Sequence, residues 1–398
     1  MEGKVKGGCT SKVIKQIDGI EVEFTKKYDI EKLCATGNEQ LYHQTEKDPS
    51  DLLSKEIIQD LGHHGEGPQI KHVLKGTYIA PTGTSQDTSD FLDTCKLDQN
   101  NSLSNTPQDV VKRYTAHIAA WKIRKESTCT HHHHIGHYKA VLRQKDLSWF
   151  FFQRSDIPEM TGYSPSRHRE CVDLMIMKKT NCFDIKKQRT LGILDTEFNQ
   201  SNKKIGKEGM DNAIILGKLA PEQFAVKNTS AIEQIVFKRC ILDHHLSKRK
   251  CLALTSSDLA SCYDRIIHTA AALALLRVGI PHNRINSMFS TIQRMVHQIR
   301  TMYGDSEITY GGDEIGDWNN YPQGVLQGNA CGPTIWILIS SIVFEILHKR
   351  GFAVEICTSI SKNLFYMVGF AYVDDSDLIQ SGSDPIEVLA SMQDLLNN

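Results

Sequence analysis

Two adjacent aspartates follow a short apolar segment near the end of the chain. Residues 370–373 read Phe-Ala-Tyr-Val, and Asp374 and Asp375 come directly after them. A run rich in aromatic and β-branched residues predicts a β-strand. Adjacent aspartates most often cap a turn or a helix, but uncompensated carboxylates beside an apolar strand are costly. The placement therefore favours a hairpin tip that binds metal.

A third aspartate has a similar position earlier in the chain. Residues 251–257 form a short β-like run, which ends at Asp258. Two-metal phosphoryl transfer requires carboxylates from separate strands that converge on cations ~3.5–4 Å apart. One strand end and a neighbouring hairpin tip meet that requirement, and Mg²⁺ suits such hard oxygen ligands. We therefore expect Asp258, Asp374 and Asp375 to be catalytic and to bind two Mg²⁺ (or Mn²⁺) ions.

Charge is unevenly distributed, although the formal net charge is only −1. Residues 167–250 carry an excess of Lys and Arg, whereas residues 251–398 carry an excess of Asp and Glu. A basic block before an acidic block suits a protein that grips a polyanion with one part and gathers metal-binding carboxylates in the next. Chance asymmetry between solvated surfaces gives the same pattern, so charge alone does not decide the function.

Composition excludes several classes of protein. No stretch reaches the ~18–20 apolar residues of a bilayer span, and residues 334–347, which include Glu345, predict a buried helix. Residues 1–15 lack the pattern of a secretory signal, and the 11 cysteines contain no CxxC pair. These features predict reduced thiols in an intracellular protein without a membrane segment.

We expect the histidine run 131–134 to form a solvated turn rather than a zinc site, because consecutive residues cannot all face one ion.

Three segments resemble the catalytic boxes of reverse transcriptases. Residues 370–375 look like the Tyr-x-Asp-Asp box, and residues 258–266 (Asp-Leu-Ala-Ser-Cys-Tyr-Asp-Arg-Ile) resemble the first catalytic box. Residues 326–333 (Leu-Gln-Gly-Asn-Ala-Cys-Gly-Pro) are similar to the Pro-Gln-Gly-Ser-Pro-x-Ser-Pro turn, with Leu326 in place of its first proline. The sequences of these three segments most resemble those of the non-LTR-like retroelement enzymes common in diatom and other protist genomes.

The resemblance extends upstream and covers roughly residues 110–398. Residues 188–194 are similar to the fingers segment whose arginine reaches the nucleotide phosphates, and residues 221–224 read Pro-Glu-Gln-Phe, like the family's Pro-x-Gln-Phe. The resemblance implies four nucleotide-binding residues: Tyr263 beneath the sugar, Arg189 at the phosphates, and Gln327 and Gly328 against template and nucleotide. Four lysines of the basic block are expected to bind nucleic acid: Lys203, Lys204, Lys207 and Lys227.

The resemblance also implies an α+β architecture, that of a right-hand polymerase. We expect a helical, partly disordered N-terminal extension over 1–109, helical pre-fingers and fingers over 110–250, and an incomplete palm over 251–398. The thumb and further polyprotein segments are expected to be missing, so the chain is read as C-terminally truncated. Periodicity predicts helices over 166–177, 193–216, 263–278 and 283–302, and a hairpin over 307–315.

The implied activity is RNA-directed DNA synthesis, in which deoxynucleoside triphosphates extend a DNA primer on an RNA template. An RNA-dependent RNA polymerase is the first alternative, since it shares the palm. Those enzymes usually have Gly-Asp-Asp at the hairpin and an acid near the sugar, so Val373 and Tyr263 argue against it. The second alternative is a catalytically inactive, nucleic-acid-binding remnant of a retroelement.

Overall fold

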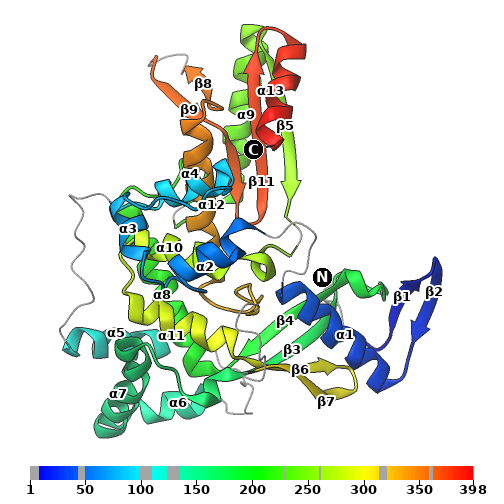
Figure 1. The fold of residues 1–398 in the computed structure, drawn as a ribbon, viewed down its shortest axis with the longest axis vertical. Helices are drawn as coiled ribbons and strands as arrows, with labels where there is room; N and C mark the ends of the chain where they lie inside the picture. The colour runs from blue at the N-terminus through cyan, green and yellow to red at the C-terminus, as the bar shows by residue number, and fades with distance from the viewer. Residues whose placement is uncertain are drawn as a thin grey trace.

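The computed structural model describes residues 9–43, 50–97, 110–122, 135–227, 229–259, 261–312, 321–357 and 362–397. The histidine run 131–134 lies outside these described residues. The strands form four small sheets, and many of the helices pack around one central core. The two larger sheets lie far apart in Figure 1, one at the top and one at the lower right, with the helical core between them and to the left.

The upper sheet has three antiparallel strands in the order β10–β11–β5. They are β5 (Cys251–Asp258), β10 (Gly369–Tyr372) and β11 (Asp375–Gly382). Strands β5 and β11 pair along their whole length, from the Cα partners Asp258 and Asp375 to Cys251 and Gly382. The expected strand and the expected hairpin are therefore confirmed, and they are neighbours in one sheet.

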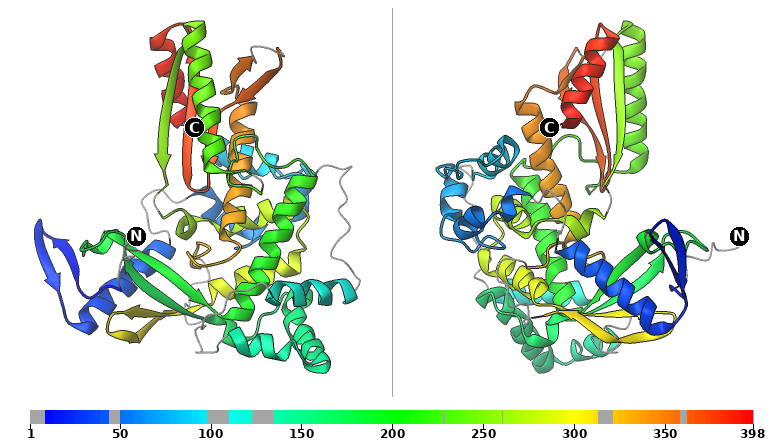
Figure 2. Two further views of the ribbon diagram at one scale, coloured as in Figure 1. Left: turned by 180° about the vertical axis from the view of Figure 1, so that it is seen from behind. Right: turned by 45° about the vertical axis from the view of Figure 1, so that its right-hand side comes forward.

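Helices cover both faces of this sheet, and this explains the unbroken apolar sequence of β10. Helices α9 (Ala231–Lys248) and α13 (Pro385–Asn397) lie on opposite faces (Figure 2). Successive residues of a strand point to opposite faces. Phe370 packs with Ile241 of α9, whereas Ala371 packs in the cluster that contains Met392 of α13, and both β10 side chains are fully buried.

The lower sheet has the order β4–β3–β6–β7, in which only β3 and β6 are parallel. Its strands are β3 (Glu170–Met177), β4 (Gln188–Leu194), β6 (Val296–Thr301) and β7 (Gly304–Gly311). Helix α1 (Lys27–Tyr42) and the hairpin of β1 (Val13–Ile17) and β2 (Ile20–Phe24) adjoin it. Ile30 of α1 and Val13 of β1 pack with Met175 and Ile299 of the sheet.

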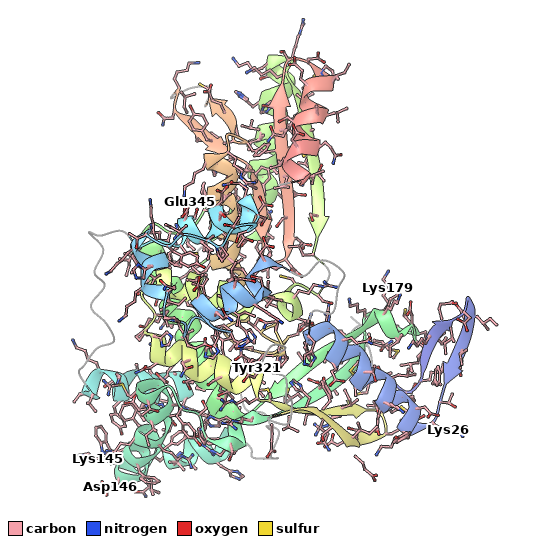
Figure 3. All side chains as sticks on the ribbon, viewed as in Figure 1. Lys26, Lys145, Asp146, Lys179, Tyr321 and Glu345 are labelled. Atoms are coloured by element: carbon pink, nitrogen blue, oxygen red, sulfur yellow. The ribbon has the colours of Figure 1, made fainter. Side chains whose placement is uncertain are left out.

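The central core is helical. Its main helices are α8 (Thr196–Ile215), α10 (His268–Arg277), α11 (His282–Gln293) and α12 (Gly332–Lys349). Three N-terminal helices contribute buried side chains to the same core: α2 (Lys55–Leu61), α3 (Ile70–Lys75) and α4 (Gln86–Thr94). The expected buried helix over 334–347 is confirmed as part of α12. Its Glu345, labelled in Figure 3, pairs with Lys349 at 3.0 Å.

The remaining elements lie at the periphery. Helices α5 (Val110–Lys122), α6 (Ile135–Val141) and α7 (Lys145–Thr161) share an aromatic cluster of Trp121, Tyr138 and Phe151. Strands β8 (Val354–Cys357) and β9 (Leu364–Met367) form a separate hairpin. Four short 3₁₀ turns are η1 (Asp51–Leu53), η2 (Ser166–Arg169), η3 (Ile185–Lys187) and η4 (Cys262–Arg265). No helix of the described residues is both long and apolar enough to cross a bilayer.

Several predicted elements are wrong. The helix expected over 166–177 is η2 followed by strand β3, and the helix expected over 283–302 ends at Gln293 and gives way to β6. The hairpin expected over 307–315 lies partly outside the described residues; its first part belongs to β7, which pairs with β6 through a turn at Met302 and Tyr303. Strands β3 and β6 pair with each other although they are distant in sequence, so local periodicity does not detect either strand. The lower sheet therefore combines strands from both sides of residue 250.

Candidate active site

The tip of the β10–β11 hairpin is held by helix α12. Val373 has a φ of 58°, a left-handed conformation that β-branched residues rarely adopt. The indole nitrogen of Trp336 donates a hydrogen bond of 2.6 Å to the Val373 carbonyl oxygen. Since Asp375 and Asp258 are register partners, all three aspartates lie at one end of the upper sheet. Trp336 thereby positions the turn that carries two of them.

A cavity of about 420 Å³ adjoins this hairpin tip. Its lining includes Asp374 and all four residues expected to contact the nucleotide, and these five residues come from four separate parts of the chain. The lining residues are Arg189, Tyr263, Leu326, Gln327, Gly328, Asn329, Pro333 and Asp374. The cavity therefore joins a strand of the lower sheet to the tip of the upper sheet through the loop before α12.

The loop before α12 fits closely against strand β4. The Gly192 amide donates a hydrogen bond of 2.7 Å to the Gln327 carbonyl oxygen. Gly328 has a φ of 123°, and a Cβ there would lie 2.2 Å from the Gly192 carbonyl oxygen. Only glycine fits such a close approach. Asn199 of α8 fixes the other side, because its amide donates to the Gly328 oxygen at 2.9 Å and accepts from the Ala330 amide at 2.8 Å.

Unusual backbone conformations gather around the cavity. Besides Val373, Leu326 has a φ of 64° and Ser261, three residues after Asp258, has a φ of 54°. Such conformations cost about 1–3 kcal/mol each and persist where the surrounding structure imposes them, most often at functional sites. Their presence in all three of the expected catalytic boxes supports a functional reason for these turns.

The Tyr263 ring is half-buried between the hairpin tip and the start of α12. A Cβ at Gly332 would lie 3.4 Å from the ring. Burial, together with the negative charge of Asp374, raises the pKa of the Tyr263 hydroxyl to about 12. The phenol is therefore neutral at physiological pH, and the ring presents an uncharged surface beside Asp374. Neighbouring Asp264 is buried, and burial together with the charge of Asp173 raises its pKa to about 7.

A second, larger cavity of about 610 Å³ adjoins the first, since Arg189 and Gln327 line both. It lies among β1, β2, α1 and the β3–β4 connection, which Lys179 marks in Figure 3. Basic side chains outnumber the two acidic ones, Asp29 and Asp264. The basic residues are Lys15, Lys32, Lys178, Lys186, Arg189 and Arg265. Four of them lie outside every motif that the sequence singled out, and only the folded arrangement identifies this basic surface.

The four lysines of the basic block are more dispersed than expected. Lys203, Lys204 and Lys207 of α8 line a different cavity, of about 580 Å³, next to α5. Lys204 forms a close ion pair with the buried Glu159 there, so its charge is compensated within the protein. Lys227 is exposed in the connection between α8 and α9. None of the four lines the cavity beside Asp374.

The Pro-Glu-Gln-Phe segment runs along the edge of the upper sheet. The Ala371 amide of β10 donates to the Glu222 oxygen at 2.8 Å, and the Phe224 amide donates to the Ala371 oxygen at 2.9 Å. The Gln223 side chain donates to Ser340 of α12 at 2.8 Å. This segment therefore supports β10 and α12, and it does not line the cavity beside Asp374.

His268 anchors the segment that leads into the Gln327–Gly328 turn. Its backbone amide donates to the Gln323 side chain at 2.8 Å, and its imidazole Nε2 lies 2.6 Å from the Gly324 carbonyl oxygen. Burial lowers the pKa of this imidazole to about 3. The structure thus keeps His268 neutral, with the ring hydrogen-bonded to the loop.

Acidification should therefore destabilise the protein through His268. The unfolded chain takes up a proton near pH 6.5, whereas the folded chain does so only near pH 3, so stability present above pH 6.5 is lost as the pH falls. The expected loss at pH 5 is about 2 kcal/mol of unfolding free energy. Urea denaturation at pH 7.5 and pH 5 measures it. Burial also lowers the pKa of His117 to about 3, so the difference between wild type and His268→Gln isolates the contribution of His268. His72→Gln, at an exposed site, should keep the full wild-type pH dependence.

A third set of polar side chains lies within the lower sheet. Cys171, Asp173 and His297 are buried, and their ligand atoms lie within 4.8 Å of one another. These thiol, carboxylate and imidazole groups could hold a metal ion of a different type from the one that three aspartates favour.

Neither a protein-family model nor a curated protein matches this chain. Its function must therefore be argued from the site itself.

Proposed function

We propose that the chain is an RNA-directed DNA polymerase that transfers nucleotides from deoxynucleoside triphosphates to a primer 3′-hydroxyl. The observation that carries the proposal is the cavity beside Asp374. Its walls include Arg189, Tyr263 and the Gln327–Gly328 turn, each of which the sequence predicts as a nucleotide contact. These three segments are distant in sequence, and their presence in the lining of one cavity supports a shared role in nucleotide binding.

Three aspartates are the appropriate ligands for the expected metal ions. Carboxylate oxygens suit Mg²⁺ and Mn²⁺, and Asp258, Asp374 and Asp375 come from the ends of paired strands. When bound, such ions stabilise the negative charge that develops during phosphoryl transfer. We infer that the chain's own contribution is mainly positioning, because phosphoryl transfer needs little further covalent chemistry from the protein.

The cavity residues have complementary roles in this proposal. The Arg189 guanidinium can bind two phosphate oxygens at once, and its place in the lining of the same cavity as Asp374 suits a triphosphate. The Tyr263 ring provides a flat, neutral surface for the sugar. Gly328 lets the Gln327–Gly328 turn pack closely against Gly192 of β4, so that the turn forms one wall of the cavity, where a base or template nucleotide would lie.

Primer extension tests the proposal. The chain is incubated with Mg²⁺, an RNA template with an annealed DNA primer, and either deoxyribo- or ribonucleoside triphosphates. We expect the primer to be extended with deoxynucleotides. Preferential use of ribonucleotides would favour the RNA polymerase alternative. Binding of the primed template without incorporation of either nucleotide would favour the inactive remnant.

The basic surface next to the cavity predicts how nucleic-acid binding depends on salt. Each phosphate contact contributes roughly 0.7–0.9 to the slope of log affinity against log salt concentration. Replacing Lys178 and Lys186 together by Ala should therefore lower the slope by about 1.4–1.8. Fluorescence anisotropy of a labelled RNA–DNA hybrid over a salt series measures this slope.

The matched control is the double replacement of Lys203 and Lys207 by Ala. Acidic residues Glu159, Glu208 and Asp211 line the same cavity as this second pair. We expect a smaller change in slope because these acids lower the local positive potential. An equal or larger change would place the nucleic acid along α8, as the sequence alone predicts.

A further inference from the structure

A buried cluster in the lower sheet is independent of the proposed polymerase site. Cys171 and Asp173 are two residues apart on β3 and so share one face of the strand. His297 on the adjacent parallel strand β6 is the register partner of Cys171. Figure 1 shows β3 and β6 side by side in this sheet. The three side chains are 1%, 0% and 3% exposed.

The Asp173 carboxylate lies among polar groups without a lysine or arginine partner in the described part of the chain. Its Oδ2 lies 3.0 Å from His297 Nδ1 and accepts a close hydrogen bond from the Tyr310 hydroxyl. Its Oδ1 lies 3.5 Å from Cys171 Sγ. A fully buried carboxylate is costly when no full positive charge compensates it. A divalent cation would supply that charge.

We propose that Cys171, Asp173 and His297 bind a structural Zn²⁺ ion. Zinc binds thiolate, imidazole and carboxylate at about 2.0–2.3 Å in a tetrahedron, so its ligand atoms lie roughly 3.3–3.8 Å apart. His297 Nδ1 lies 3.0 Å from Asp173 Oδ2 and Cys171 Sγ lies 3.5 Å from Asp173 Oδ1, both close to this range. All three ligand atoms lie within 4.8 Å of one another, so the side chains would draw together around one ion. Sulfur and nitrogen ligands select zinc rather than magnesium.

The site would join parts of the chain that are distant in sequence. It crosslinks β3 to β6, and a Cβ at Gly192 of β4 would lie 3.4 Å from Cys171 Sγ. Gly192 in turn donates to Gln327. Tyr310, the register partner of His297 on β7, orients the carboxylate from the other side. The ion would thus brace the sheet that carries Arg189, as a structural ion and not as the catalytic one.

Metal analysis of the purified full chain tests the site without reference to polymerase activity. We expect about one Zn²⁺ per chain by mass spectrometry after purification without chelators. Asp173→Asn, Cys171→Ser and His297→Ala should each lower the zinc content by about tenfold or more. Cys331→Ser, which changes another buried free thiol, should retain it.

Two measurements on the wild-type chain keep the test decisive if a variant fails to fold. Removing the ion with a chelator should lower the unfolding temperature, and added Zn²⁺ should restore it. Replacement by Co²⁺ should give a sulfur-to-cobalt charge-transfer band. A wild-type chain that contains no zinc, takes up no Co²⁺ and is insensitive to chelator would overturn the proposal. The cluster would then be a hydrogen-bonded network in which the Asp173 carboxylate pairs with His297 and Tyr310.

Discussion

Replacing Asp374 by Asn is expected to lower the rate of primer extension by roughly a thousandfold. The change removes a charged oxygen ligand but keeps the size of the side chain, and loss of a group that stabilises the charge of the transition state costs on the order of 10²–10³ in rate. The hairpin should survive, because its tip is held through the Val373 carbonyl and not through the Asp374 side chain. Single-nucleotide incorporation in rapid-quench experiments measures the rate.

Glu387→Gln is the matched control for Asp374→Asn. It also removes one carboxylate from the upper part of the molecule, but from an exposed position on α13. This control should incorporate nucleotides at the wild-type rate. If Asp374→Asn retained more than a tenth of the wild-type rate with an unchanged unfolding temperature, Asp374 would not be a metal ligand in the reaction.

Replacing Tyr263 by Ala is expected to raise the ratio of ribo- to deoxynucleotide incorporation by roughly tenfold or more. The half-buried ring lines the cavity beside Asp374 and lies next to Gly332 at the start of α12. A ring at this position leaves room for a deoxyribose but conflicts with a ribose 2′-hydroxyl. Such discrimination arises from a clash with the wrong substrate and needs no extra attraction to the correct one.

Tyr263→Phe separates the ring from its hydroxyl. This variant keeps the ring that would exclude ribose. Its ratio of ribo- to deoxynucleotide incorporation should therefore stay within about twofold of the wild-type ratio. Competition between a deoxynucleotide and the matching ribonucleotide in one reaction gives the ratio for each variant. An unchanged ratio in Tyr263→Ala would make the ring a packing element and would revive the RNA polymerase alternative.

The strand ends beside the cavity were predictable from local signals, whereas its other lining residues, Arg189, Tyr263, Gln327 and Gly328, were expected from the resemblance to reverse transcriptases. An apolar run that ends in carboxylates predicts a strand with polar ends, and the register of Asp258 with Asp375 agrees with that prediction. Gly328 was predictable as part of a turn. Its φ of 123° and its close contact with Gly192 explain why this position requires glycine. The long helix α12 was equally clear from its continuous apolar sequence.

Other features depend on contacts between distant segments. Residues 170–177 satisfy a helical pattern, yet they form β3 because they pair with β4 and with β6, which lies more than a hundred residues away. Trp336 and Asn199 support the site by single hydrogen bonds to backbone groups. The basic surface that includes Lys178 and Lys186 forms only because α1 and the β3–β4 connection lie next to each other. No local pattern identifies such residues.

The most direct test of the proposed site is a structure determined with a deoxynucleoside triphosphate and Mn²⁺. Anomalous scattering locates the ions without ambiguity. We expect two Mn²⁺ ions roughly 3.5–4 Å apart at the end of the upper sheet, bound by Asp258, Asp374 and Asp375. The triphosphate should reach toward Arg189, with the sugar over Tyr263. Ions bound away from these three aspartates, or a nucleotide bound outside this cavity, would contradict the proposed function.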